Sequence, residues 1–304
     1  LAEREPLIER SALNGAVVYP EFLTDDARLT MATVRSAIDY GATVSTYLKA
    51  VNIHREGDFV ISAASTLPAD TSEVTLRARA VVNAAGPWVD EVCGLEGPQA
   101  PRLALSRGVH LVFNHADLPV RNTVVMRTPD GRRIFAVPLG QYTYIGTTDD
   151  YHPEFEYWPP VTEQDVSYLL SATRRVMPEA SLSPEQIVSV WSGIRPLVGD
   201  GSGRASKELS RKDEVWTSPS GLLSVGGGKL SAYRAMAERV VDTVIENHDF
   251  TAKPCATAQV PLPGGETAVS ADRLSGVEGA PAERLARLYG AEASEVASSA
   301  GEGG

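Results

Sequence analysis

The spacing of hydrophobic and polar positions predicts an α/β protein in which helices and strands alternate in the N-terminal part. Asp25 and Asp26 oppose the positive end of a helix dipole, and Gly41 supplies a left-handed stop. A capped helix is therefore expected over residues 24–41, and another helix begins at Pro87. Short β-branched runs predict strands over residues 43–47, 59–63 and 73–83.

The middle of the chain has a different pattern, in which short strands follow one another through tight turns. Asp130-Gly131 and Gly140 mark two of these turns. A helix is expected over residues 163–176, and a strand over residues 184–190 leads to Trp191. Strands over residues 103–113, 123–127, 133–138 and 142–147 form an antiparallel meander, suited to a second layer.

The C-terminal part returns to the strand–helix pattern. A short apolar strand at residues 222–225 runs into three glycines, and apolar residues then recur at helical spacing over residues 229–246. The proline-rich residues 254–265 form a linker. A further helix over residues 282–289 is typical of the opening of another domain.

Composition narrows the function classes. The 304 residues suffice for one large domain or two ordinary ones, and 43% of them are hydrophobic. The net charge of −11 repels phosphate polymers, which argues against whole-surface nucleic-acid binding. Two cysteines make no disulfide framework and favour a cytoplasmic setting, and no apolar run approaches the roughly 18–20 residues of a membrane span. Because the chain starts at Leu1 rather than Met, we expect a fragment of a longer protein.

The turn between the apolar strand and the following helix is the first candidate site. Gly226, Gly227 and Gly228 let a ligand approach the backbone closely, and the helix start offers free N–H groups. Lys229 adds a full positive charge, so the turn suits a phosphate or the electron-rich edge of a reduced flavin. An ordinary strand-to-helix turn explains the same residues, and the local sequence favours neither interpretation.

Residues 81–88 are a second candidate ligand site, because a buried strand there ends in small residues. Ala84, Ala85 and Gly86 allow a ligand to lie against the backbone. A tight helix–sheet turn packed by Trp88 is the simpler explanation. Taken alone, this segment favours the simpler explanation over a ligand site.

Arg195 is the leading candidate for binding an anion. It stands between Gly193-Ile194 and Pro196, and the proline restricts it to extended geometry. A guanidinium held in one direction suits bidentate binding of a carboxylate or a phosphate, although a salt-bridged surface arginine fits the composition equally well. Arg211 is a weaker candidate, since it lies in a mixed charge run typical of a solvated turn.

The histidines and cysteines give no support for a metal site. The five histidines lack the spacing of zinc ligands, and the cysteines form no CxxC motif. His110 is the only histidine considered as an acid/base group, and a structural histidine is the favoured alternative. No GxSxG or Walker A motif is present, so acyl transfer through that serine and P-loop phosphate transfer lack support.

Five short motifs follow one another along the chain. They are Thr24-Asp25-Asp26-Ala27-Arg28-Leu29, Asn83-Ala84-Ala85-Gly86-Pro87-Trp88-Val89-Asp90, Gly146-Thr147-Thr148-Asp149, Gly193-Ile194-Arg195-Pro196-Leu197 and Gly227-Gly228-Lys229-Leu230-Ser231-Ala232-Tyr233-Arg234. In this order they resemble the FAD-dependent, aerobic-type glycerol-3-phosphate dehydrogenases. The similarity runs from about residue 13 to residue 248.

The resemblance implies an α/β flavin fold of the glutathione-reductase and amino-acid-oxidase type, with FAD as the cofactor. It also implies oxidation of sn-glycerol 3-phosphate to dihydroxyacetone phosphate by hydride transfer from substrate C2 to flavin N5. Arg195 and Lys229 should then bind substrate, with Arg211 on the phosphate, and either His110 or a residue outside this chain should act as the base. The cofactor-binding residues implied are Ala84, Ala85, Gly86, Trp88, Gly193, Gly227, Gly228, Lys229, Leu230 and Ser231.

The same resemblance implies the domain organisation. An incomplete FAD-binding domain would comprise residues 24–102 and 218–250, and an antiparallel substrate domain would comprise residues 1–23 and 103–217. Residues 251–304 would be a linker and the start of a helical domain. The family's N-terminal GxGxxG unit is absent, so we expect this chain alone to bind FAD weakly and to be inactive.

The resemblance also bears on the partners of the protein, and two alternative functions stay open beside it. The resemblance implies a quinone as the electron acceptor, and it is compatible with a homodimer and with peripheral contact at the inner face of the cell membrane. One alternative is a related flavin oxidase that passes electrons to O2 and acts on glycerol phosphate, an amine or an amino acid. The other is a binding fragment without flavin. Peroxide release, turnover of glycine and the flavin absorbance separate these alternatives.

Overall fold

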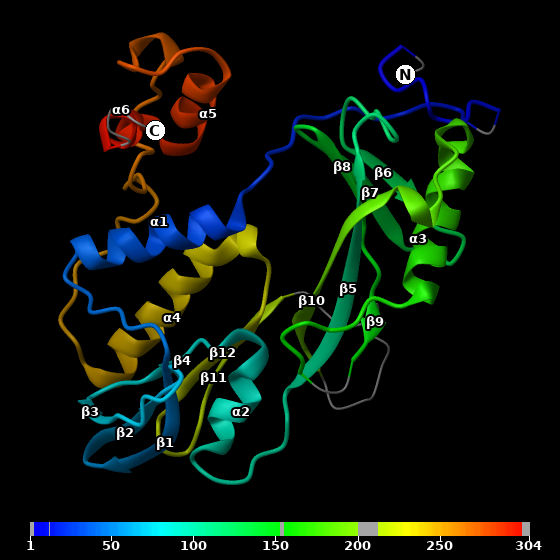
Figure 1. The fold of residues 1–304 in the computed structure, drawn as a ribbon. Helices are drawn as coiled ribbons and strands as arrows, with labels where there is room; N and C mark the ends of the chain where they lie inside the picture. The colour runs from blue at the N-terminus through cyan, green and yellow to red at the C-terminus, as the bar shows by residue number, and fades with distance from the viewer. Residues whose placement is uncertain (1–2, 12, 153–154, 200–211, 300–304) are drawn as a thin grey trace. The chain divides into compact units, whose positions relative to one another are not determined.

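The computed structural model describes residues 3–11, 13–152, 155–199 and 212–299 (Figure 1). The chain divides into two compact units. Unit 1 comprises Leu1–Pro20, Val51–Ser62 and Thr75–Lys229, and unit 2 comprises Glu21–Ala50, Ala63–Val74 and Leu230–Gly304. The assignment of an FAD-binding domain and a substrate domain stays a prediction.

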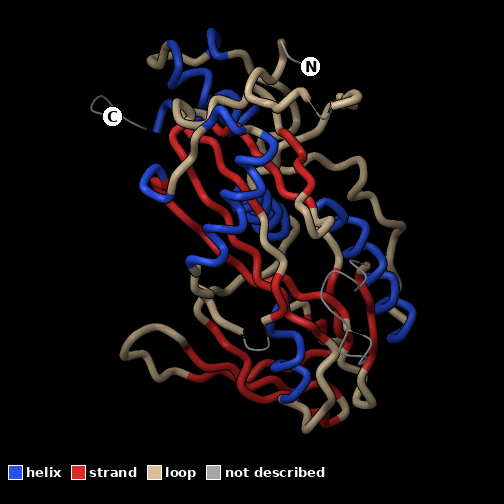
Figure 2. Tube along the Cα trace, turned by 90° about the vertical axis from the view of Figure 1, so that its right-hand side faces the viewer, coloured by secondary structure: helices blue, strands red, loops and turns tan. Residues whose placement is uncertain are grey.

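Unit 1 is built around a six-stranded antiparallel sheet with the order β10-β5-β8-β7-β6, and β9 pairs with β5. Helix α3 (Glu163–Val176) lies over one face of this sheet (Figures 1 and 2). The strands of this sheet are β5 (Leu103–Asn114), β6 (Val124–Arg127), β7 (Arg133–Leu139), β8 (Tyr142–Gly146), β9 (Asp150–Tyr151) and β10 (Ile187–Val198). The expected meander is confirmed for β6, β7 and β8, whereas β5, expected to precede β6 in it, pairs with β8 and β10 instead.

Side chains alternate between the two faces of the sheet, and one face forms the core of unit 1. Val109, Leu111 and Phe113 of β5 are fully buried there against Leu169 of α3. Each such side chain contributes about 1.5–3 kcal/mol when it leaves water. The residues between them on β5 consequently lie on the opposite face.

Helix α3 begins and ends where its sequence predicts. The Thr162 hydroxyl accepts a hydrogen bond from the Asp165 backbone N–H, and the Asp165 carboxylate accepts one from the Thr162 N–H at 2.8 Å. This capping box satisfies two N–H groups that the first turn leaves unpaired. Arg174 and Arg175 lie in the last turn, where positive charge complements the helix dipole.

Strand β10 differs from the expectation. A strand was expected over residues 184–190, but Pro184–Gln186 forms a 3-10 turn and β10 runs from Ile187 through Arg195 to Val198. The reason is tertiary, because β10 pairs with the equally long β5 along its whole length. Pro196 is tolerated inside it, since β10 is the edge strand of the sheet.

A second sheet of unit 1 has the order β11-β12-β4. Strand β12 (Leu223–Gly227) pairs in parallel with β4 (Val82–Asn83) and antiparallel with β11 (Asp213–Thr217), which the sequence did not predict. The 3-10 turn η1 (Gly86–Trp88) and helix α2 (Val89–Gly94) follow β4. The two parallel strands therefore end side by side.

The third sheet corrects two expectations. Its strands β1 (Leu48–Glu56), β2 (Asp58–Ser65) and β3 (Glu73–Ala78) follow one another in order. The strand expected at residues 43–47 is absent, because Tyr47 has a φ of 57° and turns the chain before β1 begins. The strand expected at residues 73–83 is divided, because its two halves, β3 and β4, pair in different sheets.

Unit 2 contains the two long helices α1 (Asp26–Asp39) and α4 (Tyr233–His248). The Asp25 carboxylate caps α1 by accepting from the Arg28 N–H at 3.0 Å, and Gly41 follows with a φ of 92°. The helix expected from Lys229 onward begins later, after a 3-10 turn at Leu230–Ala232. Gly227 and Gly228 both have positive φ and hold the chain out of helical geometry until that turn.

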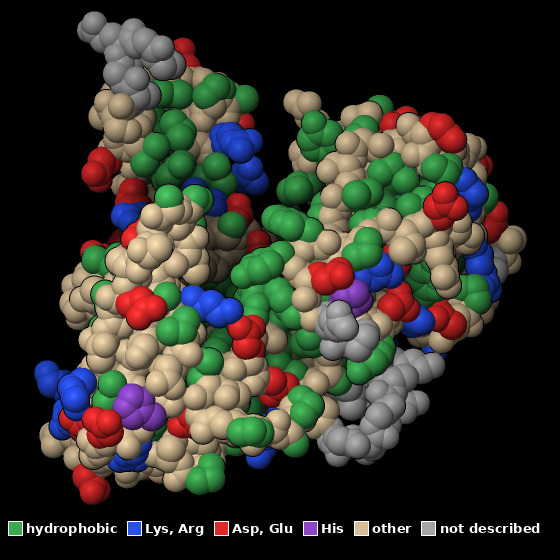
Figure 3. Space-filling model, turned by 60° about the horizontal axis from the view of Figure 1, so that its bottom comes forward, with side chains coloured by type: hydrophobic (Ala, Val, Ile, Leu, Met, Phe, Trp, Pro, Cys, Tyr) green, Lys and Arg blue, Asp and Glu red, His purple; other side chains and the backbone are tan. Residues whose placement is uncertain are grey.

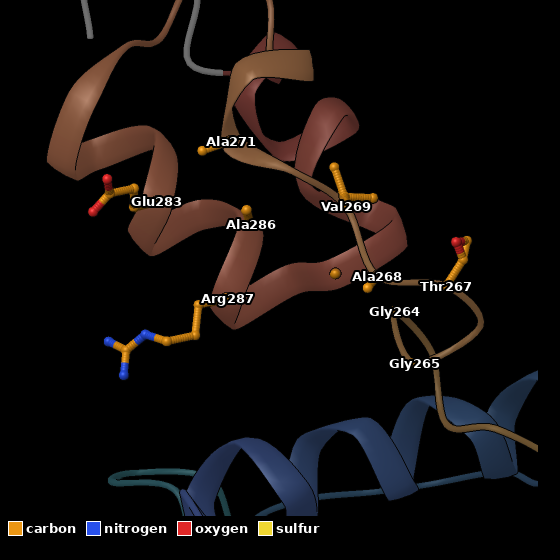
Figure 4. A pocket seen from close by; sticks show the side chains of 10 residues that line it. Gly264, Gly265, Thr267, Ala268, Val269, Ala271, Glu283, Ala286 and Arg287 are labelled. Atoms are coloured by element: carbon orange, nitrogen blue, oxygen red, sulfur yellow. The ribbon is translucent and has the colours of Figure 1, made fainter.

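The C-terminal part of unit 2 contains α5 (Gly279–Tyr289) and α6 (Ala293–Ser299). Leu274, Ala282 and Ala293 form its small core. Figure 4 shows a hollow between α5 and the segment that precedes it, lined mainly by glycine, alanine and valine. Arg287 and Glu283 of α5 are the charged side chains at this hollow.

Candidate active site

The candidate site lies on the face of the six-stranded sheet opposite α3, here called the open face. Antiparallel pairing places three residues of β5 directly beside three residues of β10. The cross-strand pairs are Ser106 with Arg195, Gly108 with Gly193, and His110 with Trp191. Two residues singled out from the sequence, Arg195 and His110, thus come together on one surface.

The Arg195 guanidinium lies flat over the backbone of Gly108. A Cβ atom at position 108 would be 2.1 Å from Nη2 of Arg195, so only glycine leaves room for this arrangement. Nη2 donates to the Thr147 hydroxyl at 2.7 Å, and Nη1 donates to the Thr148 carbonyl at 3.2 Å. The Arg195 side chain is 28% exposed, so it is both fixed and accessible to an anion.

A carboxylate lies behind this arginine. Oδ1 of Asp149 is 3.8 Å from Nη1 of Arg195 and accepts a hydrogen bond from the Ser106 hydroxyl. Ser106 is fully buried. The Asp149 carboxylate therefore partly balances the positive charge of Arg195.

His110 is held between aromatic rings. Its imidazole stacks on the Trp191 indole at 4.8 Å between centroids and contacts Tyr144 edge-on at 5.9 Å. A Cβ at position 146 would be 2.2 Å from Cδ2 of His110, so Gly146 makes room for the ring. Burial, together with the positive charge of Arg195, lowers the pKa of His110 to about 4. Among the described residues, Nδ1 of His110 has no hydrogen-bond partner.

The open face also carries exposed apolar side chains. Trp191 is 42% exposed, and Phe135 and Tyr142 on β7 and β8 are also exposed. On the face of the molecule that Figure 3 draws, hydrophobic side chains also lie beside charged ones in the right-hand part of the view. The exposed Trp191 ring, on the strand that also carries the fixed Arg195 cation, suits a flat ligand that carries an anionic group.

The turn after β4 is rigid and is formed by small residues. Nδ2 of the buried Asn83 donates to the Val89 carbonyl at 2.9 Å, and Oδ1 accepts from the Ala85 N–H at 3.3 Å. Gly86 has a φ of 57°, a conformation that favours glycine. Trp88 packs on Phe155 at 4.2 Å between ring centroids, so its indole contacts a residue outside this turn.

The glycine turn after β12 lies at the Arg195 end of the six-stranded sheet. A Cβ at position 227 would be 2.9 Å from Cγ2 of Val198, the residue that ends β10. Gly227 and Gly228 have φ values of 75° and 82°, so both positions favour glycine. Lys229, directly after them, is exposed.

Three of the motifs singled out from the sequence therefore meet in unit 1. Strand β10, which carries Gly193 and Arg195, contacts both η1 and β12. A Cβ at Gly193 would have no atom of the described residues within 4 Å, so the surface above it is open with respect to them. Two turns with exposed backbone, an open glycine and a cationic side chain fit a large, flat, anionic cofactor such as FAD.

Two of the predicted site residues belong to unit 2, and a third lies outside the residues that the structure describes. Leu230 and Ser231 form the turn before α4. Arg211 lies outside the described residues. Sequence reasoning missed Ser106, Asp149 and Trp191, although the alternation along residues 106–110 already places Ser106 on the same face as His110.

Metal sites and membrane-spanning helices are both absent from the described part of the chain. Within those residues, no group of His, Cys, Asp and Glu is arranged to hold a metal ion. None of the described helices combines the length and hydropathy that crossing a membrane requires.

Comparison with known proteins connects this geometry to a family. The family model described as FAD dependent oxidoreductase matches residues 1–234. Over 291 residues the chain is 36% identical to an aerobic glycerol-3-phosphate dehydrogenase of Bacillus subtilis (strain 168), covering 93% of this chain and 52% of that protein. The chain spans about half the length of the curated relatives it matches.

Solved structures agree with the family. The X-ray structure of the glycerol-3-phosphate dehydrogenase from Bacillus halodurans complexed with FAD has a TM-score of 0.84 and 35% identity, and the match covers 98% of this chain and 60% of that one. Glycine oxidase from Geobacillus kaustophilus, at 21% identity and a TM-score of 0.52, covers 75% of this chain and 56% of its own and shares the fold. The expected flavin fold and its FAD cofactor are confirmed at the level of the family. The chain belongs to the family of FAD-dependent oxidoreductases.

Proposed function

We propose that the protein oxidises sn-glycerol 3-phosphate to dihydroxyacetone phosphate with FAD as its cofactor. The Bacillus relatives support this substrate. The observation that carries the proposal is the presence of the Arg195 guanidinium and the His110 imidazole on one open face. A fixed cation can hold a phosphate ester, while a neutral imidazole nearby can take the proton of its hydroxyl group.

Arg195 and Lys229 bind the phosphate group in this proposal, with Arg211 as a further cation. Arg195 is fixed by the Thr147 hydroxyl and the Thr148 carbonyl before any ligand arrives, which lowers the entropy lost on binding. Lys229 follows the glycine turn that lies at the same end of the sheet. A dianionic phosphate gains more from such a cluster than a singly charged carboxylate does.

His110 is the general base in this proposal. As the C2 hydroxyl proton moves to a ring nitrogen of His110, the C2–H bond breaks with its electron pair and leaves a carbonyl at C2. FAD, when bound, supplies the acceptor for that electron pair. Because Arg195 contributes to the low pKa of His110, a bound phosphate dianion that offsets this charge raises the pKa and makes the base stronger.

The cofactor would be held by the two backbone turns and by the open glycine of β10. Gly86 and Gly227 have positive φ, and the space above Gly193 is open, so the backbone can approach a ring or a pyrophosphate at these places. The full set proposed is Ala84, Ala85, Gly86, Trp88, Gly193, Gly227, Gly228, Lys229, Leu230 and Ser231.

The electron acceptor belongs to the same proposal. We assign a quinone on the basis of the family resemblance, and peripheral membrane contact and a homodimer rest on the same argument. An oxidase would instead release hydrogen peroxide in proportion to substrate consumed. Measuring peroxide and quinone reduction side by side with glycerol 3-phosphate as substrate separates the two acceptors.

Substitution of Arg195 tests the function directly. In FAD-loaded protein with a GxGxxG segment joined to this chain or supplied in trans, Arg195→Ala is expected to lower kcat/KM for glycerol 3-phosphate by about 30-fold to several thousand-fold, because a charge-assisted contact to the phosphate is lost. Steady-state kinetics measures this loss. Arg77→Ala, at an exposed arginine of β3, is the matched control. Near-normal kcat/KM in a folded, flavin-loaded Arg195→Ala protein would contradict the assignment, as would faster turnover of glycine than of glycerol 3-phosphate.

A further inference from the structure

Asp149 occupies a place that the proposed function does not yet use. Its side chain is only 12% exposed, and its Oδ1 lies 3.8 Å from Nη1 of Arg195. A carboxylate beside an anion-binding arginine weakens the net positive charge of the site. The contribution of Asp149 to the site is therefore something other than its charge.

The surroundings of Asp149 indicate that its position is rigid. Oδ1 accepts a hydrogen bond from the fully buried Ser106 hydroxyl, and the Asp149 carbonyl accepts one from Nη1 of Arg132 at 3.2 Å. The preceding Thr148 hydroxyl accepts from the Val109 N–H of β5 at 3.0 Å. The turn that carries Asp149 is thus anchored twice to β5, through Ser106 and Val109, and once to the Arg132 side chain.

Arg195 meets this rigid turn on several sides. Gly108 lies beneath the guanidinium, and Thr147, Thr148 and Asp149 lie around it. A free arginine side chain loses rotamer entropy when it binds a ligand, and fixing the side chain in advance removes that cost from ligand binding. Ser106, directly opposite Arg195 in the strand pairing, fixes the carboxylate that in turn fixes the arginine.

We propose that Asp149, held by Ser106, is a positioning residue that sets the direction in which Arg195 presents its guanidinium to the phosphate group. Asp149 acts through Arg195 and has no contact of its own with the substrate. This inference rests on the proposed function for the identity of the ligand. The orientation of Arg195 can nevertheless be measured without any substrate.

The first test measures how firmly Arg195 is held in the FAD-loaded protein. Phenylglyoxal reacts with accessible arginines, and peptide mass spectrometry gives the rate at each position. Asp149→Asn keeps the shape of the side chain and removes its charge, so we expect the modification rate of Arg195 to rise about 3- to 10-fold, the range for loss of a partly buried ion pair. Ser106→Ala should raise the rate in the same direction by a smaller factor.

Matched controls separate positioning from a general loosening of the fold. Asp150→Asn removes the neighbouring carboxylate, which faces Arg132 and Arg107 at 3.3 and 4.0 Å, and should leave the Arg195 rate unchanged. The exposed Arg77 serves as an internal reference in every sample. An Arg195 rate that is unchanged in both Asp149→Asn and Ser106→Ala overturns the proposal, as does an equal rise in Asp150→Asn.

The second test is a double-mutant cycle on glycerol 3-phosphate turnover. Asp149→Asn is expected to raise KM about 10-fold with a smaller change in kcat, because a correctly oriented arginine contributes to binding. In an Arg195→Lys background the same substitution should change KM by less than about 2-fold, since lysine has no planar fork to orient. Equal effects in both backgrounds overturn the proposal. Turnover is measured in FAD-loaded protein in which a GxGxxG segment is joined to this chain or supplied in trans. Absence of turnover in that unsubstituted, FAD-loaded protein overturns the proposed function instead, and the phenylglyoxal result then decides the positioning role.

Discussion

Single residues of the open face are selected by the side chains that lie against them. Gly108 and Gly146 are glycines because a Cβ at either position would overlap Arg195 or His110, at 2.1 and 2.2 Å respectively. The Trp191 indole covers one side of the His110 ring. The chemistry of Arg195 and His110 therefore depends on three neighbours that carry no charge.

The lowered pKa of His110 predicts a specific loss of stability in acid. The unfolded chain takes up a proton near the ordinary pKa of 6.5, whereas the folded chain resists protonation until about pH 4. The contribution of neutral His110 is complete above pH 6.5 and is lost as the pH falls toward 4. Urea unfolding across this range should show a fall in the free energy of unfolding on the order of 1–3 kcal/mol from this residue.

His110→Gln is the control for that measurement, because glutamine does not titrate. The free energy of unfolding of the unsubstituted protein should fall relative to that of His110→Gln as the pH drops from 6.5 to 4. NMR titration of the histidine ring protons gives the pKa independently. A His110 pKa near 6.5 in the folded protein, or a difference that is constant with pH, would refute the prediction.

The bounds of a helix or strand agree with the prediction where capping residues and apolar spacing define them locally. They differ where pairing with a distant strand sets the length of the element. The capping residues and apolar spacing of residues 163–176 define α3 without help from the rest of the fold. The strand expected at residues 184–190 begins and ends earlier than the observed β10, because the length of β10 is set by its pairing with β5. Arg195 was therefore expected after a strand, whereas it lies within one.

The N-terminus of α3 supports a prediction at this scale. Thr162→Ala removes one cap and should cost about 0.5–2 kcal/mol of folding free energy. Asp165→Ala should cost about 3–5 kcal/mol, because Asp165 also pairs with the nearly buried Arg107 at 2.9 Å and its loss leaves that charge with only the more distant Asp150 carboxylate, at 4.0 Å. Chemical denaturation of both variants tests the ranking.

Glu163→Ala is the matched control, since Glu163 is exposed in the same first turn. Its effect should be within about 0.5 kcal/mol, as for most surface substitutions. An Asp165→Ala protein as stable as Thr162→Ala would show that the Arg107 pair contributes little. In that case the capping box alone explains the helix start.

At the scale of the whole molecule, the chain exposes large apolar side chains along one extended segment. Val17 is 87% exposed and Phe22 is 93% exposed, with Val18, Tyr19 and Leu23 also accessible. Apolar side chains gathered in this way favour association. We expect the 304-residue chain by itself to bind anilinonaphthalene sulfonate and to self-associate as its concentration rises.

Fluorescence of the dye and light scattering measure these two properties. Replacing Val17 and Phe22 together with serine should lower both signals while leaving the free energy of unfolding within about 0.5 kcal/mol, because neither side chain is packed. Serine substitution at Leu111, in the core, is the opposite control and should destabilise the fold. Dye binding that is unaffected by the double substitution would assign the apolar surface to another part of the chain.

The sequence by itself determined the class of the fold, the glycine turns and the family resemblance, because periodicity, caps and short motifs are local properties. Only the tertiary structure decided that Arg195 and His110 share one face, that Trp191 covers the imidazole, and that Ser106 and Asp149 hold the arginine. The physical reason is register. A shift of one residue between β5 and β10 would move every side chain of the shifted strand to the opposite face, and that choice depends on the core packed against α3 rather than on either strand alone.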